Sequence, residues 1–245
     1  MPLFKVQDRI VHFIHIPKTG GTSIEKWFGE RFPSMYMNGK LEGIDATLQH
    51  MDKRQYPLLI SGWADFEFTI VRDPIYRMIS AYRWRYARAA QEGRYVPSFK
   101  IWLIFKLRAA ERNPRIDDNF YVPQSEFVGE ETIVFKFEDG LDHALKSLKR
   151  ELPICDDRPL PHFYKSQKLP VDIDQECLDL IKRSYDNDFY LFDYDADRKL
   201  KESEGLHFSD HIKISSLFVK ELRQGILSGV AGYLMRRIPY LSRRK

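Results

Sequence analysis

The segment 10–28 constrains the fold of this chain more than any other. Residues 10–16 are mostly apolar and rich in β-branched side chains, which predicts a buried strand. A proline and two adjacent glycines interrupt this pattern, and apolar residues return at helical spacing from Ile24. The sequence therefore predicts a strand, a tight loop and a helix.

The loop between this strand and helix has the composition of an anion-binding site. Its residues are Lys18, Thr19, Gly20, Gly21, Thr22 and Ser23. The glycines allow backbone N–H groups to approach a ligand closely, and the N-terminus of the helix carries a partial positive charge. The lysine adds a full positive charge. We therefore expect the loop to bind a phosphate group.

The order of residues in this loop bears on the kind of nucleotide enzyme. In the P-loop of nucleotide triphosphatases the lysine follows the glycines. Here Lys18 precedes them, and no second glycine lies five residues upstream. A nucleotide-dependent kinase or hydrolase of P-loop type is therefore the second hypothesis.

A second strand-to-helix junction follows the first. Residues 66–71 are mostly apolar and predict a largely buried strand. Asp73 is suited to the N-cap of the next helix, and Pro74 is suited to its first position. Arg72 then lies at the carboxyl end of the strand. Ligands bind at that edge of open α/β sheets, where Lys18 is also expected.

Arg72 and Ser80 together suit an isolated phosphate monoester. A guanidinium can bind a phosphate through two hydrogen bonds, and a serine hydroxyl can add a third. The alternative is that Arg72 pairs with Asp73 or a helix end, while Ser80 is a small residue in a packed helix.

These two motifs resemble those of sulfotransferases that use 3′-phosphoadenosine-5′-phosphosulfate (PAPS). Residues 18–23 are similar to the 5′-phosphosulfate-binding loop of that family, and residues 68–82 are similar to its 3′-phosphate-binding segment. The resemblance runs from about residue 10 to 195 and is to the carbohydrate type, including bacterial and Golgi polysaccharide sulfotransferases. It implies a single P-loop-like α/β domain, with a central, mostly parallel sheet flanked by helices. It also implies PAPS as co-substrate, no metal, and a carbohydrate or glycolipid acceptor.

The resemblance assigns roles to individual residues. It implies that Lys18 and its loop bind the 5′ end of the donor, and that Arg72 and Ser80 bind the 3′-phosphate. It further implies that His50, in the pair Gln49-His50, is the general base. Without the resemblance, a surface or capping role for this histidine is the simpler interpretation.

The chain departs from the family at one catalytic position. Several relatives that act on polysaccharides have Gly-His where this chain has Gly62-Trp63. The base is then His50 or, as a weaker candidate, Asp65, which is otherwise a turn or ion-pair residue. Trp63 can instead stack on a sugar face.

Three further segments are candidates for contact with donor or acceptor. The run Pro123-Gln124-Ser125 is similar to a family segment near donor or acceptor. Lys165 and Ser166 match a loop that can reach the donor phosphates, although Tyr164 replaces the asparagine of relatives and Lys165 can equally be a solvated charge. Residues 81–88 alternate arginine with aromatic side chains, a pattern that is partly ordinary amphipathic packing and can also mark a nucleic-acid surface. Because the run is short and belongs to the helix of the second phosphate motif, an acceptor surface for an anionic glycan is the sharper hypothesis.

The rest of the chain continues the alternation of strands and helices. Strands are predicted at the start of 58–66 and at 132–138, and helices at 98–111, 141–152 and 173–185. We expect a sulfotransferase domain over residues 1–195, and a linker with a basic amphipathic helical tail over residues 196–245.

Composition indicates the compartment and the partners. Among 245 residues the two cysteines form no disulfide framework, which favours a reducing compartment. The N-terminus has no hydrophobic signal core, no run approaches transmembrane length, and the net charge of +4 does not by itself favour nucleic acid. We expect a cytoplasmic protein, with the tail at an anionic inner membrane surface or docked on the domain or a second subunit. A non-catalytic glycan- or membrane-binding module is the remaining alternative.

Overall fold

A five-stranded sheet with the strand order β3-β1-β2-β4-β5 is the centre of the protein. The computed structural model describes residues 1–43, 46–60, 62–156, 158–160 and 169–197. The strands are β1 (Leu3–Val6), β2 (Arg9–Ile14), β3 (Ser34–Met35), β4 (Phe66–Val71) and β5 (Ile133–Lys136). β2, β4 and β5 run parallel, whereas β1 is antiparallel to both β2 and β3. The predicted α/β class with a parallel central sheet is confirmed.

The parallel strands bring the two predicted anion-binding segments to one edge of the sheet. β2 and β4 pair in a register that sets Ile14 opposite Thr69. The chain therefore leaves both strands at the same edge. Lys18 follows the end of β2, and Arg72 directly follows the end of β4.

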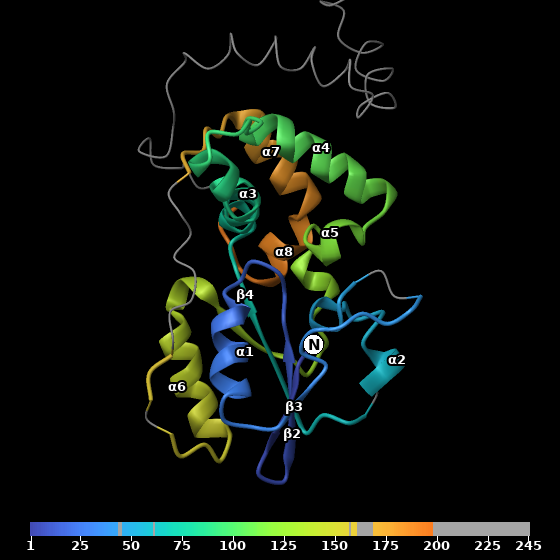
Figure 1. The fold of residues 1–245 in the computed structure, drawn as a ribbon, viewed down its shortest axis with the longest axis vertical. Helices are drawn as coiled ribbons and strands as arrows, with labels where there is room; N and C mark the ends of the chain where they lie inside the picture. Colours follow the sequence, from blue (N-terminus) through green and yellow to red (C-terminus); the bar gives the residue numbers. More distant parts are fainter. Residues whose placement is uncertain (44–45, 61, 157, 161–168, 198–245) are drawn as a thin grey trace, which may run out of the picture. The chain divides into compact units, whose positions relative to one another are not determined.

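Helices α1 (Gly21–Gly29) and α6 (Leu141–Glu151) cover one face of this sheet (Figure 1). Their apolar side chains share a core with Phe13 of β2 and Phe68 of β4. The helix members of that core include Trp27, Phe28, Leu145 and Leu148. The helix predicted for residues 141–152 is thus present as α6, with its apolar face buried.

The opposite face is covered by less regular structure. It includes the 3₁₀ turns η1 (Leu48–His50) and η2 (Gln124–Glu126) and the short helix α2 (Pro57–Ile60). Leu48 and Met51 pack with Leu3 in one apolar cluster, and Val122 packs with Ile14 in another. The segment that contains His50 is therefore anchored to the sheet.

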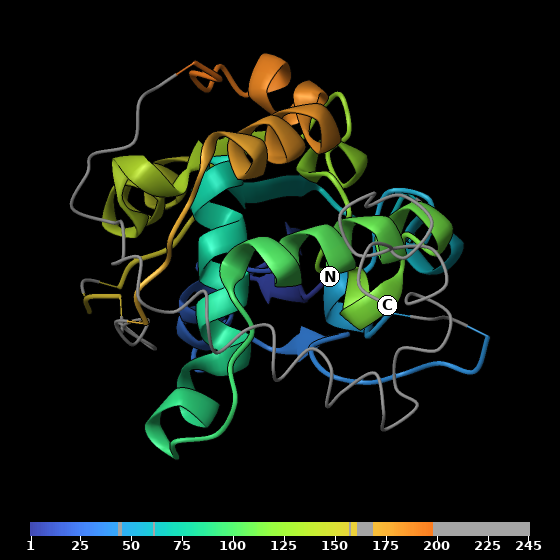
Figure 2. The ribbon, with the colours of Figure 1, turned by 90° about the horizontal axis from the view of Figure 1, so that it is seen from above.

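A third group of helices lies beyond the carboxyl ends of the strands (Figures 1 and 2). Helices α3 (Pro74–Gln91), α4 (Phe99–Arg112) and α7 (Gln175–Ser184) contact one another and share a core with α8 (Asp186–Leu191). The cap of α3 is as predicted. A side-chain oxygen of Asp73 accepts from the N–H groups of Ile75 (2.9 Å) and Tyr76 (3.3 Å), and Pro74 is the first helical residue.

The structure differs from the sequence-based expectation at residues 58–60 and at the N-terminus. The apolar residues 58–60, predicted to begin a strand, belong to α2, because a run this short fits a helix turn as well as a strand. The N-terminal strand β1 was not predicted, since charged residues flank its few apolar positions. It buries Leu3, Phe4 and Val6 by pairing with β2.

None of the described helices is both long and apolar enough to cross a membrane. The predicted tail, apart from its first two residues, lies outside the described residues.

Candidate active site

The loop after β2 forms the first part of the site. Lys18 and Gly20 have left-handed backbone conformations, with φ angles of 71° and 89°. The Thr19 hydroxyl donates to the carbonyl oxygen of Ile16 (2.9 Å), and the Ser23 N–H donates to that of Gly20 (3.1 Å). No described side chain caps the start of α1. The first turn of this helix therefore keeps a positive end without a side-chain cap, which favours an anion.

The two glycines of the loop are required by their surroundings. A Cβ atom on Gly20 would lie 2.9 Å from the Phe137 ring, in a conformation that side chains rarely adopt. A Cβ atom on Gly21 would lie 2.2 Å from Cδ2 of His15. The His15 ring thus occupies the space that a larger residue at position 21 would need. Thr22, in the same turn, is half-buried.

The Lys18 side chain lies beside α3. Its Nζ atom is 5.1 Å from the ring centroid of Trp84. Burial, and to a lesser extent the charge of Arg72, lower the pKa of Lys18 to about 8. A bound anion would oppose both effects, because it stabilises the ammonium form.

Arg72 lies against the same loop. Its Nη1 atom donates to the carbonyl oxygen of Lys18 (3.4 Å), and its guanidinium carbon is 4.3 Å from the ring centroid of Phe137. The Nε atom of Arg72 is buried and has no hydrogen-bond partner among the described residues. Burial is also the main cause of a lowered Arg72 pKa. A bound anion would relieve the cost of this unpaired donor and of the buried charge.

Gln124 holds the backbone of Arg72. Its amide nitrogen donates to the Arg72 carbonyl oxygen (2.7 Å), and its amide oxygen accepts from the Arg72 N–H (2.8 Å). The N–H groups of Gln124 and Ser125 donate to the two carboxylate oxygens of Asp188, each at 2.8 Å. The predicted Pro123–Ser125 segment therefore lies beside Arg72, and its glutamine side chain bonds to backbone.

Ser80 lies on the face of α3 that is turned toward Lys18. It is half-exposed and one helical turn before Trp84, and residues four apart share a helix face. Its hydroxyl has no hydrogen-bond partner within the part of the chain that the structure describes. This side of α3 thus presents a hydroxyl on the same helix face as Trp84, beside which the Lys18 ammonium lies.

Arg77 is a structural residue of the site that the sequence analysis missed. The side chain is entirely buried. Its guanidinium donates to the carbonyl oxygens of Pro17 (3.1 Å), Phe120 (3.1 Å) and Val122 (2.9 Å). It thereby ties α3 to the anion-binding loop and to residues 120–122. An arginine on the apolar face of a predicted helix was the available signal.

His50 lies in η1 and is 8% exposed. Its Nδ1 atom is 2.6 Å from a carboxylate oxygen of Asp118, and its Nε2 atom is 3.1 Å from the amide nitrogen of Gln49. The ring centroid of His15 is 4.9 Å away. Burial is the main cause that lowers the pKa of His50, to about 4, so the imidazole is neutral at pH 7. Asp118 is a second contact that the sequence analysis missed.

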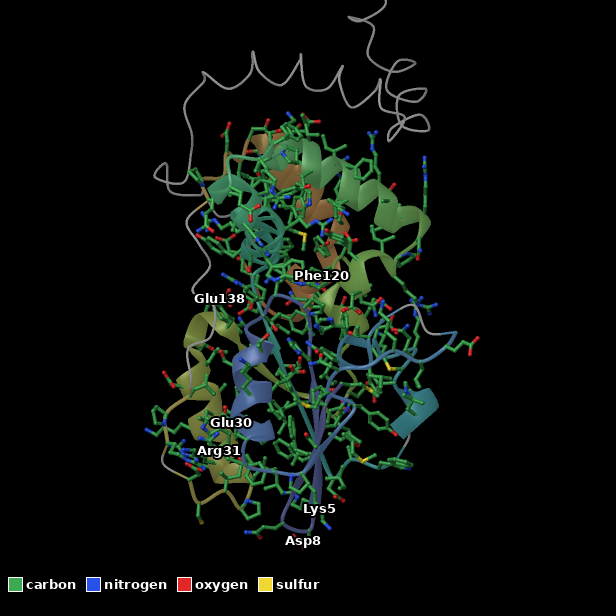
Figure 3. All side chains as sticks on the ribbon, in the orientation of Figure 1. Lys5, Asp8, Glu30, Arg31, Phe120 and Glu138 are labelled. Carbon is green, nitrogen blue, oxygen red and sulfur yellow. The ribbon has the colours of Figure 1, made fainter. Side chains whose placement is uncertain are left out.

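A row of aromatic side chains connects Lys18 with His50. Trp84 is 59% exposed, and its ring centroid lies 5.0 Å from that of Phe120. Phe120 in turn lies 5.8 Å from the His50 ring. Figure 3 shows Phe120 near the upper ends of the strands, with Lys5 and Asp8 at the opposite end of the sheet. The aromatic row therefore lies at the edge where the loop and Arg72 also lie.

Two predicted residues lie elsewhere. Trp63 and Asp65 precede β4, at the end of the sheet opposite to Lys18. A carboxylate oxygen of Asp65 accepts from the N–H of Ile10 (2.7 Å). Asp65 is thus a backbone-binding residue away from Lys18, and its location does not support a role as base. Trp63 is not brought to the loop either. Lys165 and Ser166 lie outside the described residues.

A separate open groove of about 730 Å³ lies between β5 and α8. Its lining includes Val134, Tyr190 and Phe192, together with Ser125 of the predicted Pro123–Ser125 segment. Of the described residues that line it, none is Lys18, His50, Arg72 or Ser80. Among the described residues, no three His, Cys, Asp or Glu side chains are arranged to hold a metal ion.

A parallel sheet with a glycine loop, a lysine and an arginine at the ends of neighbouring strands defines an anion-binding α/β protein of the nucleotide-binding kind. A family model described as the sulfotransferase family matches residues 3–195, and the chain belongs to this family. The protein is therefore a transferase, of a family that transfers sulfuryl groups. Comparison with curated proteins and with solved structures gave no match.

Proposed function

We propose that the protein transfers a sulfuryl group from PAPS to a hydroxyl of a carbohydrate acceptor. The main support for PAPS as the donor is the contact between Arg72 and the loop that contains Lys18. Two cations, both with pKa values lowered by burial, lie together at the positive end of α1. PAPS has two anionic groups, the 5′-phosphosulfate and the 3′-phosphate, and a single molecule can neutralise both cations.

In this proposal each end of the donor has its own residues. Lys18 and the N–H groups of the loop bind the 5′-phosphosulfate. Arg72 and Ser80 bind the 3′-phosphate and fix the position of the nucleotide. The unpaired Nε atom of Arg72 and the unpaired hydroxyl of Ser80 supply the hydrogen-bond donors for this phosphate.

The chemical step is an in-line transfer. The acceptor oxygen forms a bond to sulfur while the bond from sulfur to the 5′-phosphate oxygen breaks. The electron pair of that bond leaves with adenosine 3′,5′-bisphosphate, whose developing charge Lys18 stabilises. His50 takes the proton of the acceptor hydroxyl on Nε2. Gln49 bonds to this nitrogen, so the acceptor hydroxyl has to replace the glutamine amide.

The aromatic row supports a ring-shaped acceptor. Trp84 is exposed next to the Lys18 ammonium, and Phe120 leads from it to His50. A sugar ring that stacks on Trp84 would have a hydroxyl between the donor and the base. Arg85, the exposed neighbour of Trp84 on α3, adds a positive charge that suits an anionic glycan or glycolipid.

Transfer of label from ³⁵S-PAPS to a panel of glycan, glycolipid and phenolic acceptors tests this function. We expect a labelled carbohydrate product and no need for added metal. Lys18→Ala should lose at least ~100-fold in turnover, as for loss of an oxyanion-binding group. Lys26→Ala, on the exposed side of α1, is the matched control. The proposal fails if Lys18→Ala remains folded and transfers label at the normal rate.

The location of the protein and the role of residues 196–245 are part of the proposal. We expect a cytoplasmic enzyme whose basic tail contacts an anionic membrane surface. Co-sedimentation with vesicles of anionic or neutral lipid tests this contact. The full chain should bind only the anionic vesicles, and a chain that ends at residue 195 should bind neither while it retains transferase activity.

A further inference from the structure

The hydrogen bond between His50 and Asp118 defines where the imidazole proton lies. Its length is 2.6 Å, from Nδ1 to a carboxylate oxygen. Hydrogen bonds from His50 and Thr47 lower the pKa of Asp118 to about 2 against the opposing effect of burial, so the carboxylate is ionised at neutral pH and can only accept. The proton of a neutral His50 must therefore be on Nδ1. The contact of Nε2 with the donating amide of Gln49 agrees with this tautomer.

The Asp118 carboxylate is itself held in place by the turn that contains His50. The Thr47 N–H donates to one carboxylate oxygen (2.5 Å), and the Thr47 hydroxyl donates to the other (2.9 Å). The backbone N–H of His50 donates to the carbonyl oxygen of Thr47 (3.0 Å). Histidine and carboxylate are thus fixed to the same turn, which limits rotation of the imidazole.

The backbone around Asp118 is held in a conformation that is unfavourable without compensation. Asp117, Asp118 and Asn119 have φ angles of 50°, 65° and 61°. Left-handed conformations of non-glycine residues are costly and persist where the surroundings impose them, often at functional sites. The Asn119 side chain donates to the carbonyl oxygen of His50 (2.8 Å). This segment therefore holds His50 at both its backbone and its ring.

The other titratable groups near His50 do not replace Asp118. His15, from the end of β2, and the Met1 amino group both act to lower the pKa of His50, whereas Asp118 acts to raise it. Among the described residues, Asp118 is the carboxylate bonded to this ring. Its loss would both remove the tautomer restraint and weaken the base.

We infer that Asp118 is a positioning residue that holds His50 as the Nδ1–H tautomer, with Nε2 as the proton-accepting nitrogen. This inference rests on the proposed role of His50 as general base. Asp118 acts through His50 and touches neither donor nor acceptor.

Nitrogen NMR of the imidazole side chains tests the tautomer directly, with His50→Gln used to assign the signals. In the wild-type protein at neutral pH, His50 should have a protonated Nδ1 and an unprotonated Nε2. In Asp118→Asn the new amide can donate to Nδ1, so the proton should move to Nε2. Asp117→Asn is the matched control, because it removes the same charge from the adjacent residue, whose carboxylate pairs with Lys106. It should keep the wild-type tautomer.

Turnover separates positioning from a purely structural role. Asp118→Asn should lower kcat by about 10- to 100-fold. This loss should not exceed that of His50→Gln, because general base catalysis as a whole contributes about 10²- to 10⁴-fold. Its KM for PAPS should change little. The double variant with His50→Gln and Asp118→Asn should have the same kcat as His50→Gln alone, because the two residues act as one unit.

The outcomes distinguish this inference from the proposed function. If His50→Gln is inactive but Asp118→Asn has normal turnover, Asp118 has no positioning role and the proposed function stands. If His50→Gln is fully active, the proposed base is wrong and the inference fails with it. Wild-type His50 with its proton on Nε2 would also overturn the inference, and this result does not require that Asp118→Asn folds.

Discussion

The Nη1 atom of Arg72 lies 3.4 Å from the carbonyl oxygen of Lys18, although 54 positions separate the two residues. The parallel pairing of β2 with β4 produces this contact, because each residue follows the carboxyl end of one of these strands. The contact puts two cations at the start of α1. The charge of Arg72 contributes to the lowered pKa of Lys18. An anion bound at this edge of the sheet would therefore affect both residues.

The pH dependence of donor binding should depend on Lys18. The pKa of this residue is about 8 in the free protein, and bound anions stabilise its ammonium form. Affinity for adenosine 3′,5′-bisphosphate should change little between about pH 7 and 7.5. Above about pH 8 it should fall by up to about tenfold per pH unit, because the free protein then has a neutral Lys18. Titration calorimetry at several pH values measures this. Lys18→Met should bind this nucleotide more weakly, and its affinity should not change from about pH 7 to 9. If the affinity falls equally with pH in both proteins, a group other than Lys18 titrates.

Removal of the Arg72 side chain should affect one end of the donor. Charge-assisted hydrogen bonds contribute about 1.5–3 kcal/mol each, so Arg72→Ala should weaken binding of adenosine 3′,5′-bisphosphate by about 10- to 100-fold. Adenosine 5′-phosphosulfate, which lacks the 3′-phosphate, should bind both proteins with similar affinity. Equal losses for both ligands would mean that Arg72 supports the loop through Lys18 and does not bind the 3′-phosphate.

Gly21→Ala should displace His15 and disturb the loop. The added Cβ would lie 2.2 Å from the imidazole, and overpacking of this kind typically costs about 1–3 kcal/mol. Thermal unfolding and nucleotide binding measure the two effects. Gly29→Ala, at the other end of α1, is the control, because its Cβ meets only Met37 at 3.6 Å. If both variants behave alike, the contact between His15 and Gly21 does not constrain the loop.

Arg77→Met should destabilise the whole domain. It leaves the buried carbonyl oxygens of Pro17, Phe120 and Val122 without their donor, at a cost of about 2–5 kcal/mol in the free energy of unfolding. Urea denaturation measures this free energy. Arg85→Met, at an exposed position of the same helix, should change it by less than about 0.5 kcal/mol. A stability for Arg77→Met equal to that of Arg85→Met would show that the three hydrogen bonds contribute no net stability.

Local sequence signals were sufficient to predict strands, helix starts and caps, because each of these depends on residues of one segment. The strand at residues 66–71, the Asp73 cap and Pro74 as the first residue of α3 are present in the structure as predicted. The glycine loop is also followed at once by a helix. In each case the signal comes from steric or hydrogen-bonding properties of neighbouring residues.

Contacts between distant segments were not predictable in the same way. Asp118 meets His50 across 68 positions, and nothing in the run Asp117-Asp118-Asn119 indicates its partner beyond a tendency toward turns. The position of Arg77 on the apolar face of α3 indicates that it is buried, but nothing within α3 indicates that its partners are carbonyl oxygens of two other segments. Asp65 was a reasonable candidate by residue type, and only the strand direction places it at the wrong end of the sheet.

Equilibrium binding to the wild-type protein tests the central claim most directly. Adenosine 3′,5′-bisphosphate, in the presence of a metal chelator, should bind more tightly than ATP with magnesium, because the proposed function assigns Arg72 and Ser80 to a 3′-phosphate that ATP lacks. Lys18→Ala and Arg72→Ala should each weaken this binding. Tight binding of ATP with magnesium, together with weak binding of adenosine 3′,5′-bisphosphate, would contradict the account.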